Sequence, residues 1–242
     1  MTTDSLTALI TGGTSGIGRA TAKKLAKLGI RVIVVGRNAK RGDETLAEIR
    51  AAGGKADFIA SDLRNASCAR EVAKRAVELG SGHVDILINN AGTFPFGPTD
   101  KTTEEEFDRV YSLNVKAPYF LVAELAPLMA KRGKGAIVNV STMVADYGVS
   151  GMSLYGSSKA AINLLTKSWA AEYGPRGVRV NAVSPGPTRT EGTEPARSAR
   201  HKQAVVHTRW IPGAETVFYG FRNLDGKWKC VAASDEDLRG QM

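Results

Sequence analysis

Residues 7–27, TALITGGTSGIGRATAKKLAK, give the clearest indication of the fold. This stretch opens with a short apolar run, continues through a glycine-rich turn and ends in an amphipathic segment. A buried strand, a turn with little side-chain bulk and a helix directly after it form the first half of a βαβ unit. From this point outward we expect the chain to build a parallel sheet.

The same strand–helix alternation continues as far as Ser184. Short β-branched runs fall at residues 8–11, 32–35, 56–60, 86–88, 137–140 and 178–183. Amphipathic stretches lie between them at residues 17–28, 40–52, 67–79, 104–130 and 153–173. Six strands with five intervening helices predict an α/β fold, a Rossmann-like doubly wound parallel sheet flanked by helices.

Composition excludes several classes of protein. The 242 residues are 43% hydrophobic and 24% charged, which suits a folded domain rather than a disordered chain. No apolar run reaches the roughly 18–20 residues that cross a bilayer, and no signal peptide opens the chain. Cys68 and Cys230 have no metal-ligand spacing and cannot form a disulfide framework. We therefore expect a cytoplasmic protein without a membrane segment or a metal site.

The charge balance points to a small ligand. Lysine and arginine outnumber aspartate and glutamate by 33 to 24, a net charge of +9. The basic residues are scattered among acidic ones, and aromatic residues do not alternate with them as they do in a nucleic-acid surface. This distribution favours an anionic small molecule over a nucleic-acid partner.

The glycine-rich turn after the first strand has the pattern of a phosphate site. Gly12, Gly16 and Gly18 allow a tight turn and close approach of a phosphate to the backbone. The helix that follows offers its N-terminal N–H groups and its positive dipole end. The alternative is an ordinary glycine-rich turn without a ligand. The strand before this turn and the helix after it favour the phosphate site over that alternative. The expected contacts in this turn are Gly12, Thr14, Ser15, Gly16, Ile17 and Gly18.

The residues after the second strand indicate which dinucleotide is bound. An NAD site usually carries an acidic residue here for the ribose 2′-hydroxyl, whereas this chain has Gly36, Arg37 and Asn38. A guanidinium pairs well with a 2′-phosphate. The sequence therefore favours NADP(H), with NAD(H) as the second choice and a solvated loop arginine as the alternative for Arg37.

Three further loops are expected at the same edge, because the carboxyl ends of parallel strands meet there. Asp62 is placed to accept a hydrogen bond from the adenine amino group, with Leu63 beside it. Small residues after the fourth strand and a Pro-Gly turn after the sixth let a cofactor lie against bare backbone. The expected contacts in these two loops are Asn90, Ala91, Gly92, Pro185, Gly186 and Thr188.

Tyr155 and Lys159 lie four residues apart in a predicted helix and therefore share one face. A lysine ammonium about 4 Å from a phenol contributes roughly 4 kcal/mol at an effective dielectric constant near 20. That energy lowers the phenol pKa from about 10 to about 7. We expect Tyr155 to titrate near neutrality as a general acid or base. A hydroxyl residue, Ser141 or Thr142, ends the preceding strand.

Together these motifs resemble the short-chain dehydrogenase/reductase family, in its compact single-domain branch. The resemblance covers residues 5–190 and implies a Rossmann sheet, bound NAD(H) or NADP(H), and homotetramers or homodimers. We accordingly assign residues 1–192 to an NAD(P)-binding catalytic domain and residues 193–242 to an atypical C-terminal segment of the same domain. The residues that carry the resemblance are Thr11, Gly12, Gly16, Ile17, Gly18, Asp62, Asn89 to Gly92, Asn114, Tyr155, Lys159, Pro185 and Gly186.

The resemblance also implies catalytic roles. Tyr155 protonates the carbonyl oxygen or takes the alcohol proton. Lys159 lowers the pKa of that tyrosine and binds the nicotinamide ribose, and Asn114 holds a water of the proton relay. A serine of the family bonds the substrate oxygen, and its usual spacing of 13 residues before the tyrosine falls here on Thr142. The threonine hydroxyl can make the same bond, and Ser141 is the second candidate.

The C-terminal part departs from the family. The Phe-Leu-Ala-Ser stretch, the seventh strand and the closing Thr-Gly…Val-Asp-Gly-Gly pattern are missing after Glu194, and Trp210, Trp228, His201 and His207 crowd this part. A frameshift or gene-model error near residue 195 is one explanation, and a divergent lineage with a replaced tail is the other. We expect the homo-oligomer only if this part folds.

The expected function is an NADP(H)-dependent oxidoreductase that moves hydride between the nicotinamide and a carbonyl or alcohol substrate. A nucleotide-binding protein without turnover, because its C-terminal part is altered, is the second hypothesis, and a sugar-nucleotide epimerase or dehydratase the third. Residues 93–99, 143–154 and 187–215 are expected to select the substrate. Apolar side chains in the first two segments indicate a medium-sized apolar carbonyl compound; they are Phe94, Phe96, Met143, Tyr147, Met152 and Leu154.

Overall fold

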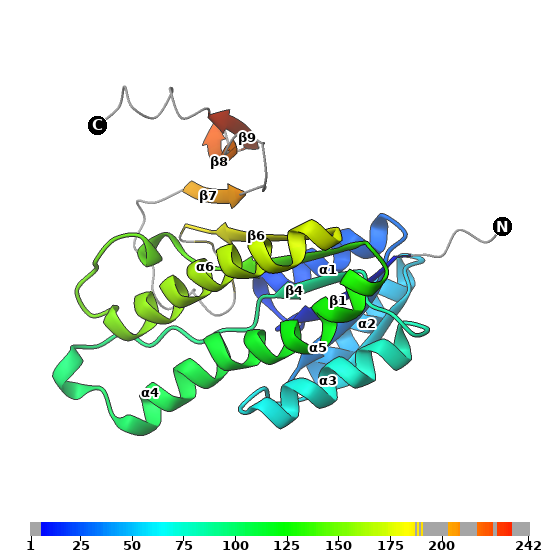
Figure 1. Ribbon diagram of the computed structural model, residues 1–242, viewed down its shortest axis with the longest axis horizontal. Coiled ribbons are helices and arrows are strands. Elements are labelled where there is room, and N and C mark those ends of the chain that lie inside the picture. Colours follow the sequence, from blue (N-terminus) through cyan, green and yellow to red (C-terminus); the bar gives the residue numbers. More distant parts are fainter. Residues whose placement is uncertain are drawn as a thin grey trace.

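The computed structural model describes residues 6–186, 188 and 190 in full and the backbone of residues 203–208, 217–224 and 227–233. Six neighbouring strands of the sheet are parallel and follow the order β3-β2-β1-β4-β5-β6 (Figure 1). They are β1 (Thr7–Thr11), β2 (Arg31–Gly36), β3 (Ala56–Ala60), β4 (Ile86–Asn89), β5 (Gly135–Val140) and β6 (Val178–Ser184). The predicted doubly wound parallel sheet is confirmed, and its strand order reverses between β1 and β4.

Helices connect the strands. They are α1 (Gly16–Lys27), α2 (Ala39–Ala51), α3 (Ala66–Leu79), α4 (Glu104–Tyr111), α5 (Ala117–Lys131) and α6 (Ser153–Tyr173). Asn38, Asn65 and Thr103 cap α2, α3 and α4 by accepting the backbone N–H three residues later. Single turns of 3₁₀-helix lie at Thr99–Lys101, Met143–Ala145 and Gly174–Arg176.

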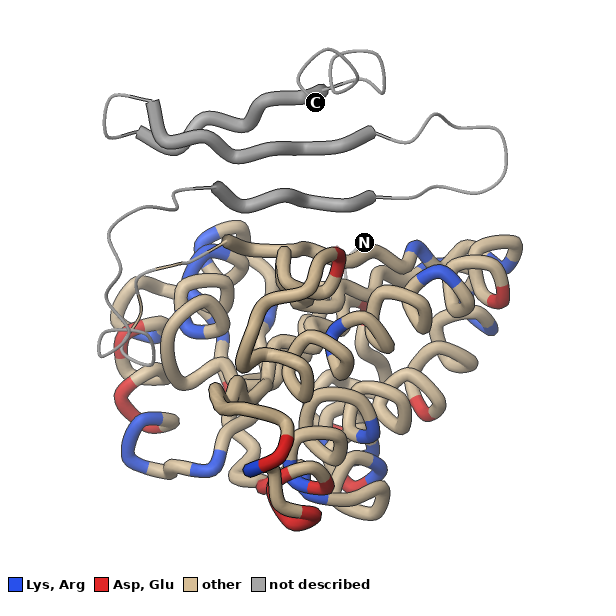
Figure 2. Tube along the Cα trace, turned by 90° about the vertical axis from the view of Figure 1, so that its left-hand side faces the viewer, with Lys and Arg blue, Asp and Glu red and all other residues tan. Residues whose placement is uncertain are grey.

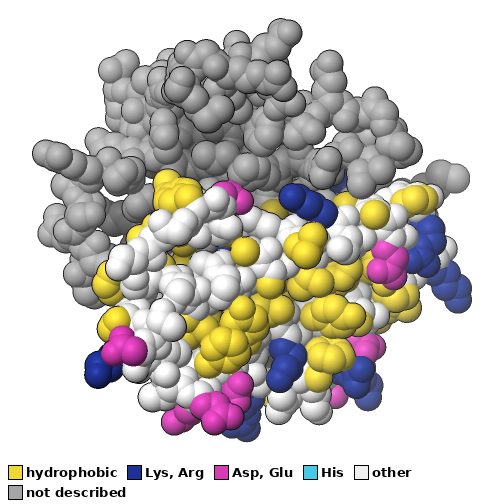
Figure 3. All heavy atoms as spheres, turned by 60° about the vertical axis from the view of Figure 1, so that its left-hand side comes forward, with side chains coloured by type: hydrophobic (Ala, Val, Ile, Leu, Met, Phe, Trp, Pro, Cys, Tyr) yellow, Lys and Arg dark blue, Asp and Glu magenta, His cyan; other side chains and the backbone are white. Residues whose placement is uncertain are grey.

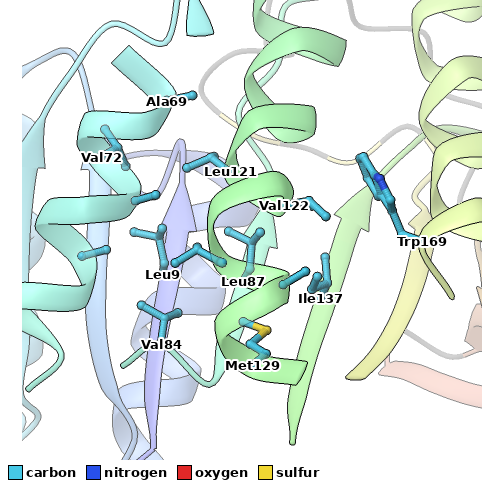
Figure 4. Close-up of a cluster of buried hydrophobic side chains, with 14 of the residues drawn as sticks. Leu9, Ala69, Val72, Val84, Leu87, Leu121, Val122, Met129, Ile137 and Trp169 are labelled. Carbon is cyan, nitrogen blue, oxygen red and sulfur yellow. The ribbon is translucent and has the colours of Figure 1, made fainter. Parts of the chain in front are cut away.

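Both faces of the sheet are buried, and neighbouring residues of one strand enter different cores. Leu9 of β1 packs with Leu87, Ile137 and side chains of α3 and α5 (Figure 4). Ala8 and Ile10 of the same strand pack on the other face, against α1 and α2. Because alternate strand residues point to opposite faces, a strand covered by helices on both sides must be apolar throughout.

The sequence predicts one helix over residues 104–130, whereas the structure divides it. A π-helical turn, Ser112–Lys116, separates α4 from α5. Asn114 lies in this turn, where its side chain bonds both backbone groups of Thr93. The apolar face runs through the turn, with Val110, Ala117 and Leu121 buried, so hydrophobic periodicity shows no break. Such turns are frequent at functional sites.

Beyond β6 the sheet continues with β7 (Gln203–Thr208), β8 (Val217–Leu224) and β9 (Lys227–Ala233). Each pairs antiparallel with the strand before it. The sequence carries no family pattern for a seventh strand, and the strand that lies beside β6 runs opposite to the parallel set. Residues 191–202, where the departure from the family begins, lie outside the described residues.

The surface mixes charges and carries hydrophobic side chains on one side. Figure 2 shows Lys and Arg spread over the helical body with Asp and Glu between them, and Figure 3 shows hydrophobic side chains gathered across one face. Large exposed hydrophobic residues on α4, α5 and α6 include Phe107, Tyr119, Leu128 and Leu164. Within the described part of the chain, no helix is long and apolar enough to cross a membrane.

Asp85 ties together the amino ends of three strands. Its carboxylate accepts the Thr7 N–H of β1 at 2.8 Å and pairs with Arg132, which follows α5, at 2.5 Å. Its own backbone carbonyl accepts the Ala136 N–H of β5. Burial alone raises the pKa of the Asp85 carboxyl, but the bonds from Thr7 and Arg132 and the charge of Arg132 outweigh it and lower the pKa below 3.8.

Asp85→Asn should therefore reduce stability in a pH-dependent way. A carboxyl whose pKa is lower when folded stabilises the protein above its unfolded pKa, and that contribution is lost as pH falls through the folded pKa. We expect the free energy of unfolding to fall by about 1–3 kcal/mol at pH 7, and the difference from wild type to shrink toward pH 3. Urea unfolding at both pH values measures this. Asp100→Asn, at an exposed pair with Lys101, serves as the control and should change little.

Candidate active site

The carboxyl ends of β1, β4, β5 and β6 open onto one cavity of about 500 Å³. It lies where the strand order reverses, which is where doubly wound sheets bind their ligands. The loops after these strands and the first turns of α1 and α6 form the described lining. The lining residues are Gly12, Ser15, Gly16, Ile17, Asn90, Ala91, Gly92, Phe94, Val140, Ser141, Thr142, Met143, Val144, Met152, Tyr155, Lys159, Pro185, Gly186, Thr188 and Thr190.

Hydrogen bonds hold the glycine-rich turn after β1 against the end of β4. Thr11 Oγ1 accepts the N–H groups of Asn90 and Ala91, both at 3.0 Å. Asn90 Nδ2 donates to the carbonyl oxygens of Thr11 and Gly12, at 2.9 and 3.2 Å. A Cβ on Gly18 would lie 2.4 Å from that Nδ2 and from the Gly12 oxygen. Glycine is therefore required at position 18 for the turn and the helix to approach this closely.

The first turn of α1 presents its positive end to the cavity. Ser15 is the N-cap residue, its side chain makes no capping bond, and the first turn contains no acidic residue. Gly12 has a φ of +64°, and a Cβ there would lie 2.9 Å from Asn90 Nδ2. A bare backbone turn and a helix dipole thus meet in one space, and this arrangement fits the pyrophosphate of a dinucleotide.

A second pocket, of about 200 Å³, adjoins the cavity and shares with it Gly12, Ser15, Ala91 and Gly92. Arg37, from the loop after β2, and Arg41, from the start of α2, both line it. Asp62, from the loop after β3, lines it as well. The remaining described lining residues are Thr14, Val35, Gly36, Asn38, Ser61, Leu63 and Leu113.

Lys159 is buried beside the cavity. Its side chain is 4% exposed, and Nζ donates to the Val140 carbonyl oxygen of β5 at 2.7 Å. Burial lowers the pKa of Lys159 to about 8, so most of the ammonium remains charged at pH 7. A Cβ on Gly92 would lie 3.3 Å from the same Nζ. The loop after β4 therefore passes close to the ammonium.

Tyr155 differs from the sequence-based expectation. Burial raises the pKa of its phenol above the ordinary value of 10, and a side-chain hydrogen bond with Thr142 offsets part of the rise. The expected fall toward neutrality assumed that the lysine ammonium lies against the phenol. The structure instead directs Lys159 Nζ to Val140, while the phenolate loses hydration on burial. At neutral pH the Tyr155 phenol keeps its proton.

The two candidate hydroxyls at the end of β5 point to different partners. Thr142 lies close enough to the Tyr155 phenol to lower its pKa by a side-chain hydrogen bond. Ser141 Oγ donates to the Lys159 carbonyl oxygen at 3.4 Å, and Ser141 N continues the sheet by donating to Val183. Both residues line the cavity. Adjacent residues of extended backbone place their side chains on opposite faces, which explains the division.

Asn114 is buried behind the cavity wall and lines neither pocket. Its Nδ2 donates to the Thr93 carbonyl oxygen and to Ser158 Oγ, at 2.9 and 3.0 Å, and its Oδ1 accepts the Thr93 N–H at 2.9 Å. Ser158 Oγ donates in turn to the Tyr155 carbonyl oxygen at 2.7 Å. The pair Asn114–Ser158 thus joins the loop after β4 to the first turn of α6.

Most of the residues expected from the sequence meet at these two pockets. Gly18, like Asn114, lies behind the lining and shapes it from there. Sequence reasoning missed Arg41 and Ser158. The position of Arg41 in the first turn after the β2–α2 loop is a signal that identifies it. No feature of the sequence identifies Ser158, because a serine before Lys159 has the pattern of any small residue in a helix.

Known proteins are similar to this chain in sequence and in structure. The family model described as short chain dehydrogenase matches residues 6–201. An uncharacterized oxidoreductase of Thermotoga maritima is 42% identical over 184 residues, which make up 76% of this chain and 72% of that protein. A solved structure of a short chain dehydrogenase/reductase family protein is 46% identical with a TM-score of 0.74, over 79% of this chain and 78% of the other.

A second solved structure carries a bound nucleotide. It is a short-chain dehydrogenase from Sphingobium yanoikuyae in complex with NADPH, 36% identical with a TM-score of 0.73, over 77% of this chain and 72% of the other. The segment matched by the family model contains the glycine turn, residues 89–92 and the Tyr155–Lys159 pair. The chain therefore belongs to the short-chain dehydrogenase/reductase family of oxidoreductases.

Proposed function

We propose that this protein is an NADP(H)-dependent oxidoreductase that transfers hydride between the nicotinamide and a carbonyl or alcohol substrate. One observation carries the proposal: Tyr155 and Thr142 line the same cavity as the glycine turn and the first turn of α1. A proton donor and a dinucleotide cradle therefore share one space, and a substrate carbonyl beside the nicotinamide would lie within reach of both hydroxyls.

The residues present fit a dinucleotide along the sheet edge. The turn of Gly12, Ser15 and Gly16 would hold the pyrophosphate, because it brings backbone and the N-terminal end of α1 to the cavity. Ala91, Gly92, Pro185, Gly186 and Thr188 would line the nicotinamide half with little side-chain bulk. When bound, NADPH supplies the hydride that, with one proton, converts a carbonyl to an alcohol, and NADP⁺ accepts hydride in the reverse direction.

Charge at the second pocket supports NADP(H) over NAD(H). Arg37 and Arg41 both line this pocket, and the loop after β2 lacks the acidic residue of an NAD site. Two guanidinium groups suit a dianionic 2′-phosphate. Asp62, which lines the same pocket, would accept a hydrogen bond from the adenine amino group, and Leu63 would lie beside the ring. The bound NADPH in the Sphingobium yanoikuyae relative is consistent with this assignment.

Tyr155 would act as the proton donor during carbonyl reduction. Its raised pKa keeps the phenol protonated at neutral pH, which is the form that an acid requires. Thr142, which lines the same cavity and lowers the pKa of the Tyr155 phenol, would hold the same substrate oxygen. The mostly charged Lys159, one helical turn away, would stabilise the phenolate that remains after proton transfer and bind the nicotinamide ribose.

Asn114 would act as a positioning residue. Its side-chain bonds fix Thr93 on one side and Ser158 on the other. Through these two contacts it sets the loop after β4 and the first turn of α6 at a constant separation, which fixes Tyr155 relative to the cavity. The role of holding a relay water, which the family resemblance implies, stays a prediction.

Nucleotide binding without turnover is the competing function, because β7, the strand beside β6, runs antiparallel to the six parallel strands. NADPH oxidation with a panel of carbonyl compounds separates the two. Binding seen by NADPH fluorescence, with no oxidation by any carbonyl, would favour the binding protein. The homo-oligomer and the cytoplasmic location stay predictions.

Tyr155→Phe tests the proton donor. The variant keeps the ring and loses the hydroxyl, so we expect kcat to fall by about 10²–10⁴-fold, with NADPH affinity largely retained in a fluorescence titration. Tyr119→Phe removes a hydroxyl from an exposed ring on α5 and should leave both quantities unchanged. Wild-type turnover in Tyr155→Phe would refute its role.

The two hydroxyls of β5 can be separated in the same assay. Thr142→Val replaces a hydroxyl by a methyl group at constant shape, and we expect kcat to fall by roughly 10²-fold, the usual cost of one lost donor to a reacting oxygen. Ser141→Ala removes only the 3.4 Å bond to Lys159 and should change kcat far less. The reverse order of effects would reassign the role to Ser141.

Arg37→Asp tests the choice of cofactor. Loss of a charge-assisted bond and gain of a like charge should weaken NADPH binding by roughly 10- to 100-fold, with a much smaller effect on NADH. Lys40→Asp makes the same charge change at an exposed site outside the pocket lining and should affect NADPH less. Dissociation constants for both nucleotides, measured at one ionic strength, decide the matter. Equal losses for NADPH and NADH would reject a phosphate contact.

A further inference from the structure

The reacting end of the cavity has an apolar wall. Phe94 from the loop after β4, Met143 and Val144 after β5, and Met152 at the start of α6 all line it, next to Tyr155. We propose that the substrate is an uncharged ketone or secondary alcohol with a hydrophobic group beside the carbonyl carbon, and that Phe94 is the residue that selects this group. The inference rests on the proposed function and names the substrate class of that site.

The structure separates lining residues from neighbours of the same type. Phe96, Tyr147 and Leu154 lie in the same two segments, but none of them lines the cavity. The Phe96 ring covers Gly151 instead, where an added Cβ would lie 2.9 Å from Cζ. Phe94 is therefore the aromatic residue from the loop after β4 whose side chain faces the reacting end.

Several bonds fix the position of Phe94. Asn114 holds the backbone N–H and C=O of Thr93, the residue before it. Three residues after it, Gly97 N donates to the Gly151 carbonyl oxygen at 2.9 Å. The wall is thus tied both to the helix behind it and to the segment that carries Met152. Because this apolar surface is already in position, binding of a hydrophobic group does not require the loop to lose conformational entropy.

The Phe94 ring has contact on one side and exposure on the other. Its edge meets the Tyr155 ring, with centroids 6.2 Å apart and planes at 65°. The side chain is still 47% exposed. This exposed aromatic surface lies next to the proposed proton donor. A hydrocarbon group of the substrate that covers it would make the free energy of binding more favourable.

The charges of the cavity argue against an anionic substrate. Among its described lining residues Lys159 is the sole charged side chain, and its ammonium bonds the Val140 carbonyl beneath the wall. A carboxylate or phosphate against Phe94 and Met152 would lose hydration, which is costly, and the described lining offers it no cation other than Lys159. The same wall accepts an aryl, cycloalkyl or alkyl group.

Two ketones that differ in a single substituent test the class. Reduction of 4-methylacetophenone and of 4-acetylbenzoate by NADPH compares a methyl group with a carboxylate on the same ring. We expect kcat/KM for the methyl compound to be at least about tenfold higher. Equal values, or a preference for the carboxylate, would overturn the inference while leaving the proposed oxidoreductase activity intact.

Variants at position 94 test whether Phe94 sets the preference between the two ketones. Phe94→Ala should lower kcat/KM for 4-methylacetophenone roughly tenfold, mainly through KM. Phe94→Arg should raise the ratio of 4-acetylbenzoate to 4-methylacetophenone, because it supplies the missing cation. Phe107→Ala is the matched control, since Phe107 on α4 is 46% exposed and outside the cavity lining. Unchanged selectivity in both Phe94 variants would show that Phe94 does not select the substrate.

A binding measurement separates this inference from the proposed function. With NADP⁺ in place of NADPH a ketone cannot be reduced, so calorimetry of the two ketones with the NADP⁺-loaded protein reports affinity alone. Tighter binding of 4-methylacetophenone, weakened in Phe94→Ala and not in Phe107→Ala, supports the apolar wall. If that pattern appears while NADPH reduces neither ketone nor any other carbonyl tested, the proposed oxidoreductase function fails and the wall's selectivity stands.

Discussion

The bonds between Thr11 and the residues after β4 determine the shape of the whole site. One hydroxyl accepts two backbone N–H groups, and one amide returns two bonds to the turn after β1. These bonds join the two strands between which the sheet order reverses. The shared wall of the two pockets, from Gly12 to Gly92, is built on this junction. Gly18 allows it, because any side chain there would push the helix away from the turn.

The groups proposed for chemistry come from separate elements that buried bonds hold together. Lys159 ties α6 to β5 through the Val140 carbonyl, and Asn114 with Ser158 ties α6 to the loop after β4. Burial acts on both titrating groups against their charged forms, so it raises the pKa of Tyr155 and lowers that of Lys159. At neutral pH these opposite shifts leave a protonated phenol on Tyr155 and a mostly charged ammonium on Lys159.

Local patterns predicted much of the architecture and failed where a distant contact intervenes. The helix at residues 153–173 has the predicted bounds, since its apolar spacing and the turn before it are local. The helix predicted over residues 104–130 is divided at Asn114, because a bond to Thr93 favours a wider turn that keeps the same apolar face. Arg41 shares a pocket with Asp62 because β2 pairs with β3, which brings the segments after these two strands together.

By itself the sequence determined the parallel sheet, the glycine turn and the set of residues at the sheet edge. Apolar periodicity, glycine and the strand–helix alternation are properties of short segments, and they act wherever those segments pack. Only the tertiary structure shows that Ser141 Oγ is directed to the Lys159 carbonyl oxygen, that Lys159 Nζ points to Val140, and that Phe94 rather than Phe96 lines the cavity. Each of these depends on where a side chain points and on which distant segment receives it, and packing settles both.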